Sequence, residues 1–292
     1  MKIYINGTFH TKEEAKISVY DHGLLYGDGV FEGIRVYNGR VFKLDEHLKR
    51  LYESANSIML AMPMTFDELR HATVLTVREN NMRDAYIRLI ITRGIGSLGL
   101  NPFSCEKPQV IIIVDKIALY PKEMYEHGMR IVTVPTQRNM AEAIPPQVKS
   151  LNYLNNILAK IEAINAGVEE AIMLNSYGLV AECTGDNIFV VKNNVIMTPP
   201  SYMGVLEGIT RNTVMELAGQ LSYTAKQRIL TRHDLFSSDE CFLTGSAAEI
   251  VPVTHVDGRT ISDGTPGYVT KQLMIAFKKL TETTGTPVFA AA

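Results

Sequence analysis

Near the middle of the chain stands the segment Pro145-Pro146-Gln147-Val148-Lys149-Ser150-Leu151-Asn152-Tyr153, followed by an apolar helical pattern that ends at Gly167. The two prolines favour a rigid extended conformation, because their rings fix φ. Lys149 therefore lies between a stiff segment and the start of a helix, where its position is restricted. A lysine positioned in this way can form a Schiff base with an aldehyde cofactor. On this segment alone, an ordinary solvated lysine before a helix is the favoured interpretation.

Three two-residue turns predict β-hairpins on either side of this segment. They are Asn6-Gly7, Asn38-Gly39 and Asp257-Gly258, and such turns need the positive φ values that Asn, Asp and Gly tolerate. Hairpins imply antiparallel pairing. Longer apolar runs predict buried strands, and these runs are Tyr86–Thr92, Val110–Val114, Arg130–Pro135 and Ile188–Val191.

Apolar residues at helical spacing predict helices between these strands. Four stripes of this kind are Leu44, Leu48, Leu51, Ala55 and Ile58; Leu154, Ile157, Leu158, Ile161 and Ile164; Val214, Leu217, Ala218 and Leu221; and Val269, Leu273, Ala276 and Leu280. Thr65-x-x-Glu68 is a capping box that opens a further helix. Hairpins mixed with helices predict α+β domains with mixed or antiparallel sheets, rather than one doubly wound parallel sheet.

The length of the chain, 292 residues, predicts a globular protein of two domains. The strand Val110–Val114 ends shortly before Tyr120-Pro121 breaks the pattern. We therefore expect an N-terminal α+β domain over residues 1–117, an interdomain loop over 118–128 and a C-terminal domain over 129–292. The tail after Thr284 is small and apolar, and we expect it to be poorly ordered.

Charge and cysteine content restrict the partners and the environment of the protein. Lys plus Arg number 29 and Asp plus Glu number 31, so the formal net charge is −2, which gives no electrostatic reason to bind nucleic acid or an anionic membrane. No run of about 18 apolar residues predicts a membrane span, and the N-terminus has no apolar signal region. The separated cysteines Cys105, Cys183 and Cys241 fit reduced thiols in the cytoplasm.

Two familiar kinds of site are not supported by the sequence. Gly94-Ile95-Gly96-Ser97-Leu98-Gly99 has the spacing of a dinucleotide-binding motif. Leu100-Asn101-Pro102 follows it, however, so no helix begins where a pyrophosphate needs one. The seven histidines are scattered without paired ligand spacing, and we expect no metal site.

Several further segments can carry chemistry, and each also has an ordinary structural explanation. Gly208-Ile209-Thr210-Arg211 opens a helix, which is either an anion site or a simple capped end. Thr244-Gly245-Ser246-Ala247-Ala248 is a turn of small residues that either donates N–H groups to an anion or packs tightly. Glu182 follows a strand and either enters a pocket or is solvated. Arg50 lies beside an apolar helical stripe and either reaches a phosphate or lies on the surface.

Taken together and in this order, the segments resemble the pyridoxal-phosphate-dependent aminotransferases of fold type IV, which have the D-amino acid aminotransferase-like fold. The segments that carry the resemblance are His47-x-x-Arg50-Leu51, Lys149-Ser150-Leu151-Asn152-Tyr153, Glu182-Cys183-Thr184-Gly185-Asp186-Asn187-Ile188-Phe189, Gly208-Ile209-Thr210-Arg211 and Thr244-Gly245-Ser246-Ala247-Ala248-Glu249-Ile250.

Two more segments narrow the resemblance to the branched-chain amino acid aminotransferases. They are Tyr26-Gly27-Asp28-Gly29-Val30-Phe31-Glu32-Gly33-Ile34-Arg35 and Tyr86-Ile87-Arg88. The resemblance spans roughly residues 1–280. It departs from the family at Cys183, where glycine is usual, and this leaves the geometry of the local turn open.

The resemblance implies a site for pyridoxal 5′-phosphate. Lys149 would hold the cofactor as a Schiff base and, once released, move the α-proton as a general acid–base. Glu182 would pair with the protonated pyridine nitrogen, and Tyr153 would hydrogen-bond the phenolate oxygen. The remaining cofactor contacts, to the ring face and the phosphate, would come from Leu206, Ile209, Thr210, Arg50 and Ser246.

The same resemblance implies the substrate contacts. The α-carboxylate would meet the Ser246-Ala247 turn and Tyr86, and the aliphatic side chain would meet Phe31 and Gly33. Arg88 would pair with the γ-carboxylate of glutamate. Tyr26 and Leu100 would come from a second subunit, because this family builds its site at a dimer interface, so we expect a homodimer or a higher homo-oligomer.

The implied reaction is transamination of leucine, isoleucine and valine with 2-oxoglutarate, giving branched 2-oxo acids and L-glutamate. Three alternatives keep the fold: a D-amino acid transaminase, an (R)-amine transaminase and an aminodeoxychorismate lyase. A further alternative is a protein that binds a ligand without catalysis. The sequence does not rank the three branched substrates.

Overall fold

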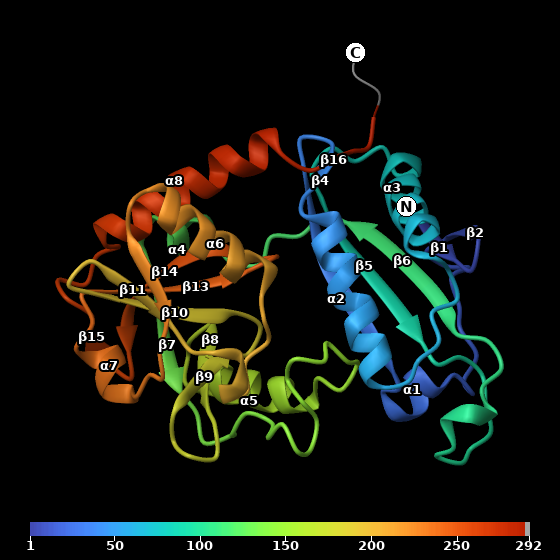
Figure 1. Cartoon of the computed structure of the whole chain (residues 1–292), viewed down its shortest axis with the longest axis horizontal. Helices are drawn as coiled ribbons and strands as arrows, with labels where there is room; N and C mark the ends of the chain where they lie inside the picture. The colour runs from blue at the N-terminus through green and yellow to red at the C-terminus, as the bar shows by residue number, and fades with distance from the viewer. Residues whose placement is uncertain (290–292) are drawn as a thin grey trace. The chain divides into compact units, whose positions relative to one another are not determined.

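The structure is a computed structural model, in which residues 1–289 are described. Its contacts divide the chain into two compact units (Figure 1). Unit 1 contains residues 1–117, the segment 148–152 and the C-terminal segment from Thr281, and unit 2 contains residues 118–147 and 153–280. Two segments of the predicted C-terminal domain, one of which carries Lys149, therefore pack with unit 1.

The sheet of unit 1 has seven strands in the order β16-β4-β3-β5-β6-β1-β2. Every neighbouring pair is antiparallel. The predicted turns are confirmed, because Asn6 and Asn38 have φ values of 50° and 49°. The strands are β1 (Lys2–Ile5), β2 (Thr8–Thr11), β3 (Gly29–Tyr37), β4 (Arg40–Val41), β5 (Ala85–Thr92), β6 (Gln109–Asp115) and β16 (Thr286–Pro287).

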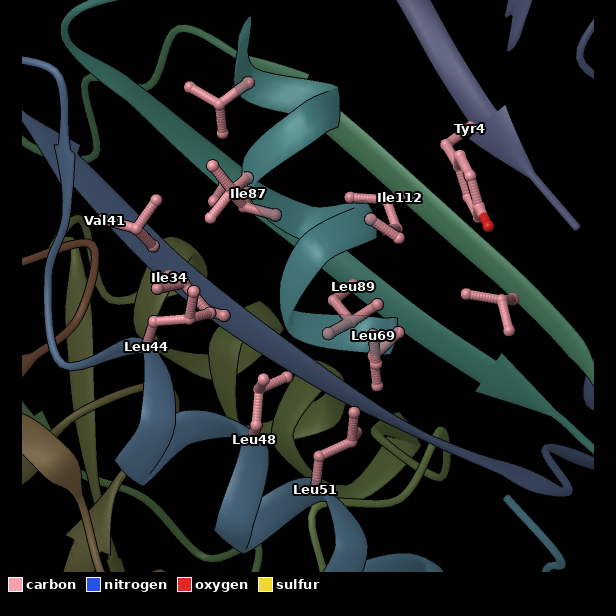
Figure 2. Close-up of a cluster of buried hydrophobic side chains, with 14 of the residues drawn as sticks. Tyr4, Ile34, Val41, Leu44, Leu48, Leu51, Leu69, Ile87, Leu89 and Ile112 are labelled. Carbon is pink, nitrogen blue, oxygen red and sulfur yellow. The ribbon is translucent and has the colours of Figure 1, made fainter. Parts of the chain in front are cut away.

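Two helices cover one face of this sheet, α2 (Leu44–Ser57) and α3 (Phe66–Glu79). Figure 2 shows Leu44, Leu48 and Leu51 of α2 among the side chains of the core over β3 and β5. All three leucines are buried, and each stabilises the fold by about 1.5–3 kcal/mol. The predicted capping box opens α3 at Thr65. The short helices are α1 (His22–Tyr26) and the 3₁₀ turn η1 (Pro102–Ser104).

The C-terminal tail differs from the expectation of poor order. Residues Thr286–Pro287 form β16, which pairs with β4, and the side chain of Val288 is fully buried in the core of unit 1. The reason is that the edge of a short strand offers unpaired backbone groups that the tail can satisfy. Residues 290–292, which the same expectation covered, lie outside the described residues.

The sheet of unit 2 has nine strands, eight of them in the order β12-β11-β10-β13-β14-β7-β8-β9, while β15 pairs with β14. Three pairs are parallel, β11 with β12, β14 with β7 and β7 with β8. The predicted α+β class with mixed and antiparallel sheets is confirmed. The strands are β7 (Met129–Thr133), β8 (Glu170–Leu174), β9 (Val180–Cys183), β10 (Asn187–Lys192), β11 (Val195–Thr198), β12 (Thr224–Gln227), β13 (Glu240–Gly245), β14 (Glu249–Val256) and β15 (Arg259–Thr260).

The helices of unit 2 include one in the segment expected to be a loop. Residues 118–128 contain α4 (Lys122–His127), which follows Pro121 and ends at Gly128 with φ 80°. None of the helices in residues 1–289 combines the length and apolar character needed to cross a membrane. The other helical elements are α5 (Leu154–Asn165), η2 (Ser201–Met203), α6 (Ile209–Gln220), α7 (Arg232–Phe236) and α8 (Tyr268–Thr283), whose last residues belong to unit 1.

Helix α5 turns a different face to the core than its apolar stripe suggests. Its buried residues are Asn156, Ala159 and Ala163, and the two alanines allow the helix to approach the sheet closely. The apolar stripe points to solvent instead, with exposed fractions of 47–66%. This exposed stripe consists of Leu154, Ile157, Leu158, Ile161 and Ile164.

Candidate active site

The backbone of Lys149 is fixed along strand β3 in unit 1. The N–H of Phe31 donates to the carbonyl of Lys149 at 3.0 Å, and the N–H of Lys149 donates to Ser54 Oγ at 3.1 Å. The N–H of Leu151 donates to the carbonyl of Gly29 at 2.9 Å. A Cβ at Gly29 would lie 2.7 Å from Leu151 Cδ1, so glycine is needed for this close approach. The segment therefore presents its lysine in a defined position.

The amine of Lys149 lies over an aromatic ring. Its Nζ is 4.6 Å from the ring centroid of Phe31, and the guanidinium carbon of Arg88 is 4.5 Å from the same centroid. Such cation–π contacts stabilise cations by about 0.5–2 kcal/mol. The structure therefore brings together an amine, an apolar ring and a guanidinium. The ring can contact an aliphatic side chain, and the guanidinium can pair with a second carboxylate of an amino acid substrate.

Strands β3 and β5 complete this group. Gly33 pairs with Arg88 in the sheet, and the guanidinium carbon of Arg88 lies 5.6 Å from the ring centroid of Tyr86. A Cβ at Gly33 would overlap the hydroxyl of Tyr86. Glycine at this position therefore leaves room for the tyrosine, and the structure brings together four predicted substrate residues, Phe31, Gly33, Tyr86 and Arg88.

Arg50 is held by the carboxylate of Glu32, a residue to which the sequence analysis gave no role. Arg50 Nε is 2.8 Å from Glu32 Oε1 and Arg50 Nη2 is 2.8 Å from Glu32 Oε2. His47 Nδ1 is 2.7 Å from Glu32 Oε2. Burial alone would raise the pKa of Glu32, but the charge of Arg50 and the hydrogen bonds from Arg50 and His47 hold that pKa well below its usual value. The available signal was an acid in the otherwise apolar strand Val30–Ile34.

Tyr26 and Leu100 lie on exposed parts of unit 1. Tyr26 ends α1, and its hydroxyl donates to the carbonyl of Leu98. Leu100 lies in the loop after β5 and is 80% exposed. The structure therefore places these two predicted substrate residues in an apolar surface, where a partner can reach them.

Glu182 is the centre of a polar network in unit 2. It is buried at the end of β9, and Arg138 Nε and Nη2 both lie 2.9 Å from its Oε1. Its Oε2 accepts from Asn187 Nδ2 at 3.1 Å and from the N–H of Leu206 at 3.0 Å. These contacts fix the orientation of the carboxylate. The sequence analysis gave neither Arg138 nor Asn187 a role: Arg138 lies outside every quoted motif, whereas Asn187 lies within the family-like segment that begins at Glu182.

The start of α6 is suited to an anion. Gly208 is the N-cap residue, and within the described chain no side chain caps the first turn. Thr210 is buried in that turn. N–H groups at such a helix start attract negative charge. A Cβ at Gly208 would overlap Asn187 Oδ1, so the same asparagine joins the Glu182 network to the α6 start.

The Ser246-Ala247 turn lies beside this network. It connects β13 to β14, and Asn187 pairs with Thr244 directly before it. Within residues 1–289, the buried hydroxyl of Thr244 has no hydrogen-bond partner. Such a hydroxyl is unusual in a folded protein unless a ligand or water satisfies it.

The remaining observations concern Tyr153, Cys183 and metals. Tyr153 is the N-cap residue of α5 and is half-buried. Cys183 lies within strand β9, so the departure from the family pattern is accommodated by extended backbone. Within residues 1–289, no group of His, Cys, Asp and Glu side chains is arranged to hold a metal ion.

Comparisons with known proteins agree with this arrangement. The family described as amino-transferase class IV matches residues 29–256. A protein of Methanocaldococcus jannaschii, provisionally named a branched-chain-amino-acid aminotransferase, is 50% identical over 289 residues, which is 99% of each chain. The crystal structure of the Escherichia coli branched-chain amino acid aminotransferase superposes with a TM-score of 0.94 at 37% identity, covering 97% of this chain and 96% of that one.

A third relative was solved with its cofactor. The branched-chain amino acid aminotransferase of Thermobaculum terrenum in its PLP form superposes with a TM-score of 0.87 at 30% identity, covering 96% of this chain and 94% of that one. The predicted family and fold are confirmed by these matches. The chain belongs to the class IV aminotransferases.

Proposed function

We propose that this protein catalyses the transamination of branched-chain L-amino acids with 2-oxoglutarate, using pyridoxal 5′-phosphate. The reaction gives branched 2-oxo acids and L-glutamate. The observation that carries the proposal is the group of Lys149, Phe31 and Arg88. The amine of Lys149 and the guanidinium carbon of Arg88 lie 4.6 and 4.5 Å from the ring centroid of Phe31. Relatives that match nearly the whole chain carry the same activity in their names.

The residues present fit the cofactor. When bound, pyridoxal phosphate supplies the electron sink that stabilises negative charge at the substrate Cα. The amine of Lys149 holds the aldehyde carbon of the cofactor and moves the proton at the substrate Cα. Glu182 accepts a hydrogen bond from the protonated ring nitrogen, and its fixed orientation supports this assignment. Tyr153 hydrogen-bonds the phenolate oxygen.

We assign the phosphate to the open start of α6. The N–H groups of Ile209 and Thr210 bind it there, and the uncapped first turn supports this assignment. Arg50 and Ser246 supply further donors. Leu206, whose N–H is fixed on Glu182, packs on the cofactor ring.

We assign the substrate to the face of β3 and β5 that presents Phe31, over which the amine of Lys149 lies. Phe31 and Gly33 contact an aliphatic side chain, and Tyr86 and the Ser246-Ala247 turn bind the α-carboxylate. Arg88 pairs with the γ-carboxylate of glutamate and stacks on Phe31 when a branched side chain is bound. The present stacking distance of 4.5 Å supports the second arrangement.

We propose that the enzyme is a homodimer or a higher homo-oligomer in the cytoplasm. Unit 1 exposes large apolar side chains on α1, just before it and in the loop after β5, and exposed apolar residues gathered in this way mark an interface. The α1 region and the loop after β5 are in contact. Asp21 and Ile95 form an isolated antiparallel β-bridge, and the N–H of Gly96 donates to the carbonyl of Tyr20. We call this apolar surface the α1 patch; its residues are Val19, Tyr20, Leu24, Leu25, Tyr26, Ile95, Leu98, Leu100 and Phe103.

The cysteines support the cytoplasmic location. All three are unpaired, as expected in a reducing compartment.

A substrate panel tests the proposed function. The purified holoenzyme is given 2-oxoglutarate with a series of L-amino acids, D-amino acids and (R)-amines, and glutamate formation is measured. We expect turnover with L-leucine, L-isoleucine and L-valine. Preference for D-amino acids or (R)-amines, or formation of pyruvate from aminodeoxychorismate, would overturn the proposal in favour of another chemistry of the same fold.

A further inference from the structure

Two buried carboxyl groups in unit 2 lie against one tyrosine hydroxyl. Tyr120 Oη is 2.9 Å from Asp186 Oδ2 and 3.2 Å from Glu170 Oε2. The exposed fractions of these residues are 7% for Tyr120, 5% for Asp186 and 2% for Glu170. Neither carboxyl is used in the proposed cofactor or substrate contacts.

The hydrogen-bond inventory of this group requires an additional proton. A phenol hydroxyl has one hydrogen, so Tyr120 can donate to only one of the two carboxyl groups. If both carboxyl groups were ionised, the Tyr120 hydroxyl would donate to one of them. Its oxygen would then face an oxygen of the other carboxylate with no proton between the two atoms. A protonated carboxyl removes this conflict, because it donates to Tyr120 Oη while Tyr120 donates to the remaining carboxylate.

The contacts favour Asp186 as the protonated partner. The second oxygen of Glu170 accepts from the N–H of Ala171 at 2.7 Å and from the N–H and hydroxyl of Thr184 at 3.0 and 2.5 Å. Three donors stabilise a negative charge on Glu170. Hydrogen-bond donation then runs from Asp186 to Tyr120 and from Tyr120 to Glu170.

The carboxyl of Asp186 also touches the turn that binds anions in the proposed function. A Cβ at Gly245 would overlap Asp186 Oδ1, so the carboxyl packs against the backbone that leads into Ser246-Ala247. A negative charge at this place would repel a bound carboxylate or phosphate, and in a buried environment that repulsion is strong. A neutral Asp186 avoids it.

We propose that Asp186 is a positioning residue that shares one proton with Glu170 through Tyr120, and that its neutral form allows the Gly245-Ser246-Ala247 turn to bind a carboxylate. The proton-sharing part is independent of the activity. The anion-binding part rests on the proposed function of the turn.

The surroundings of Asp186 predict where the proton is lost. Burial, followed by the charge of Glu170, raises the pKa of Asp186 to about 7, while the hydrogen bond that Tyr120 donates to the ionised form and the charge of Lys160 act in the opposite direction. Burial also raises the pKa of the Tyr120 hydroxyl far above its usual value, so it stays a donor. The other groups facing Asp186 are Glu182, which raises its pKa further, and the thiol of Cys183, whose own pKa burial raises well above its usual value. We therefore expect the shared proton to leave as the pH rises through about 7.

Infrared spectroscopy tests the proton directly. In the full-length protein we expect a C=O stretch of a neutral carboxylic acid that fades as the pH rises through about 7. Asp186→Asn should remove this band, and Glu170→Gln should move its loss to lower pH, because Asp186 stays buried there but no longer faces the charge of Glu170. Asp239→Asn, an exposed acid paired with Lys192 in the same unit, should keep it. A wild-type spectrum without the band, or a band that keeps its wild-type pH dependence in both pair variants, would overturn the proposal.

Anion binding tests the positioning role. The probe is 4-methylpentanoate, which has the carbon chain of leucine without the amine, and its Kd for the holoenzyme is measured against pH. In the wild type and in Asp239→Asn we expect Kd to rise about tenfold as the pH passes through about 7. In Asp186→Asn, whose side chain stays neutral, we expect a flat profile at the low-pH value. A flat wild-type profile, or an equal pH dependence in Asp186→Asn, would contradict the role.

The two measurements separate this proposal from the proposed function. A protein that failed the substrate panel would lose its assigned activity, yet the infrared band would still decide whether the proton is shared. If Asp186→Asn does not fold, the Kd profile of Glu170→Gln decides: its pH dependence should move to lower pH, because Asp186 without the charge of Glu170 ionises more readily.

Discussion

Both carboxylate oxygens of Glu32 are bound by the guanidinium of Arg50, Oε1 by Nε and Oε2 by Nη2, each at 2.8 Å. Glu32 is fully buried on β3, and Arg50 lies on α2, whose leucines anchor it to the same strand. A two-point pair of this kind fixes the plane of the guanidinium. Arg50 is therefore oriented by the protein before any ligand arrives.

We predict that Glu32→Gln weakens the binding of pyridoxal phosphate more than that of pyridoxal, which lacks the phosphate. The amide has one acceptor oxygen and no charge, so it cannot bind both guanidinium nitrogens, and Arg50, the proposed phosphate ligand, loses its orientation. The loss of such a bond costs about 1.5–3 kcal/mol, which is about 10–150-fold in Kd. Titration of the cofactor-free protein by absorbance measures both affinities.

Asp45→Asn is the matched control for this prediction. Asp45 lies on the same helix and binds Arg70 at 2.7 Å, but it is exposed. We expect it to leave both affinities unchanged. An equal loss for pyridoxal and pyridoxal phosphate in Glu32→Gln would show that Arg50 does not act on the phosphate.

The buried His47 predicts a loss of stability in mild acid. Burial is the main cause that lowers the pKa of His47 below 6.5, although Glu32 acts in the opposite direction. The unfolded chain then binds a proton more readily than the folded chain, so stability is lost as the pH falls below about 6.5. We expect the Tm of the wild type to fall by roughly 2–5 °C per pH unit there, relative to His47→Gln.

Calorimetry over this pH range checks the result, with His127→Gln as the control. His127 is an exposed histidine at the end of α4, and we expect its replacement to follow the wild-type curve. Parallel curves for the wild type and His47→Gln would contradict a neutral buried His47.

Arg88→Ala separates the two half-reactions. Without the guanidinium the γ-carboxylate of glutamate has no partner, whereas leucine loses only the covering of Phe31. We predict that kcat/KM for glutamate falls about 10–150-fold and that kcat/KM for leucine changes only a few-fold. Single-turnover kinetics with each amino acid measures this, and Arg83→Ala, an exposed arginine before β5, serves as the control. Equal losses in both half-reactions would remove Arg88 from the assigned role.

The α1 patch predicts the effect of a charge at Phe103, which is 73% exposed. An aspartate there would be buried without a partner in a dimer, so Phe103→Asp should increase the monomer fraction. Activity should fall in parallel, because Leu100 and Tyr26 of one chain are assigned to the site of the other. Sedimentation measures the mass, and Tyr177→Asp, on a turn of unit 2 with 83% exposure, is the control. A monomeric wild type, or a dimeric Phe103→Asp, would contradict this arrangement.

The sequence predicted the parts of this structure that local chemistry determines. The Asn-Gly turns formed hairpins because Asn6 and Asn38 tolerate positive φ, and Thr65 and Glu68 formed their capping box within one helical turn. In both cases the residues that determine the feature lie within a few positions of one another.

Other features depend on contacts between distant residues, which one sequence does not reveal. The partner of Arg50 is 18 residues away on another element, and β16 pairs with β4 across nearly the whole chain. The stripe Leu154–Ile164 showed that α5 has an apolar face, but periodicity alone does not tell whether a face meets its own sheet or a second molecule. Arg138, which holds Glu182, carried no motif.

Cofactor trapping on Lys149 tests the central claim most directly. Borohydride reduction of the holoenzyme fixes the cofactor on the amine that holds it, and peptide mass spectrometry then locates the modified lysine. We predict a single modified peptide that carries the cofactor on Lys149, and no incorporation in Lys149→Ala. Modification of another lysine, or a wild-type protein that takes up no cofactor, would contradict the account.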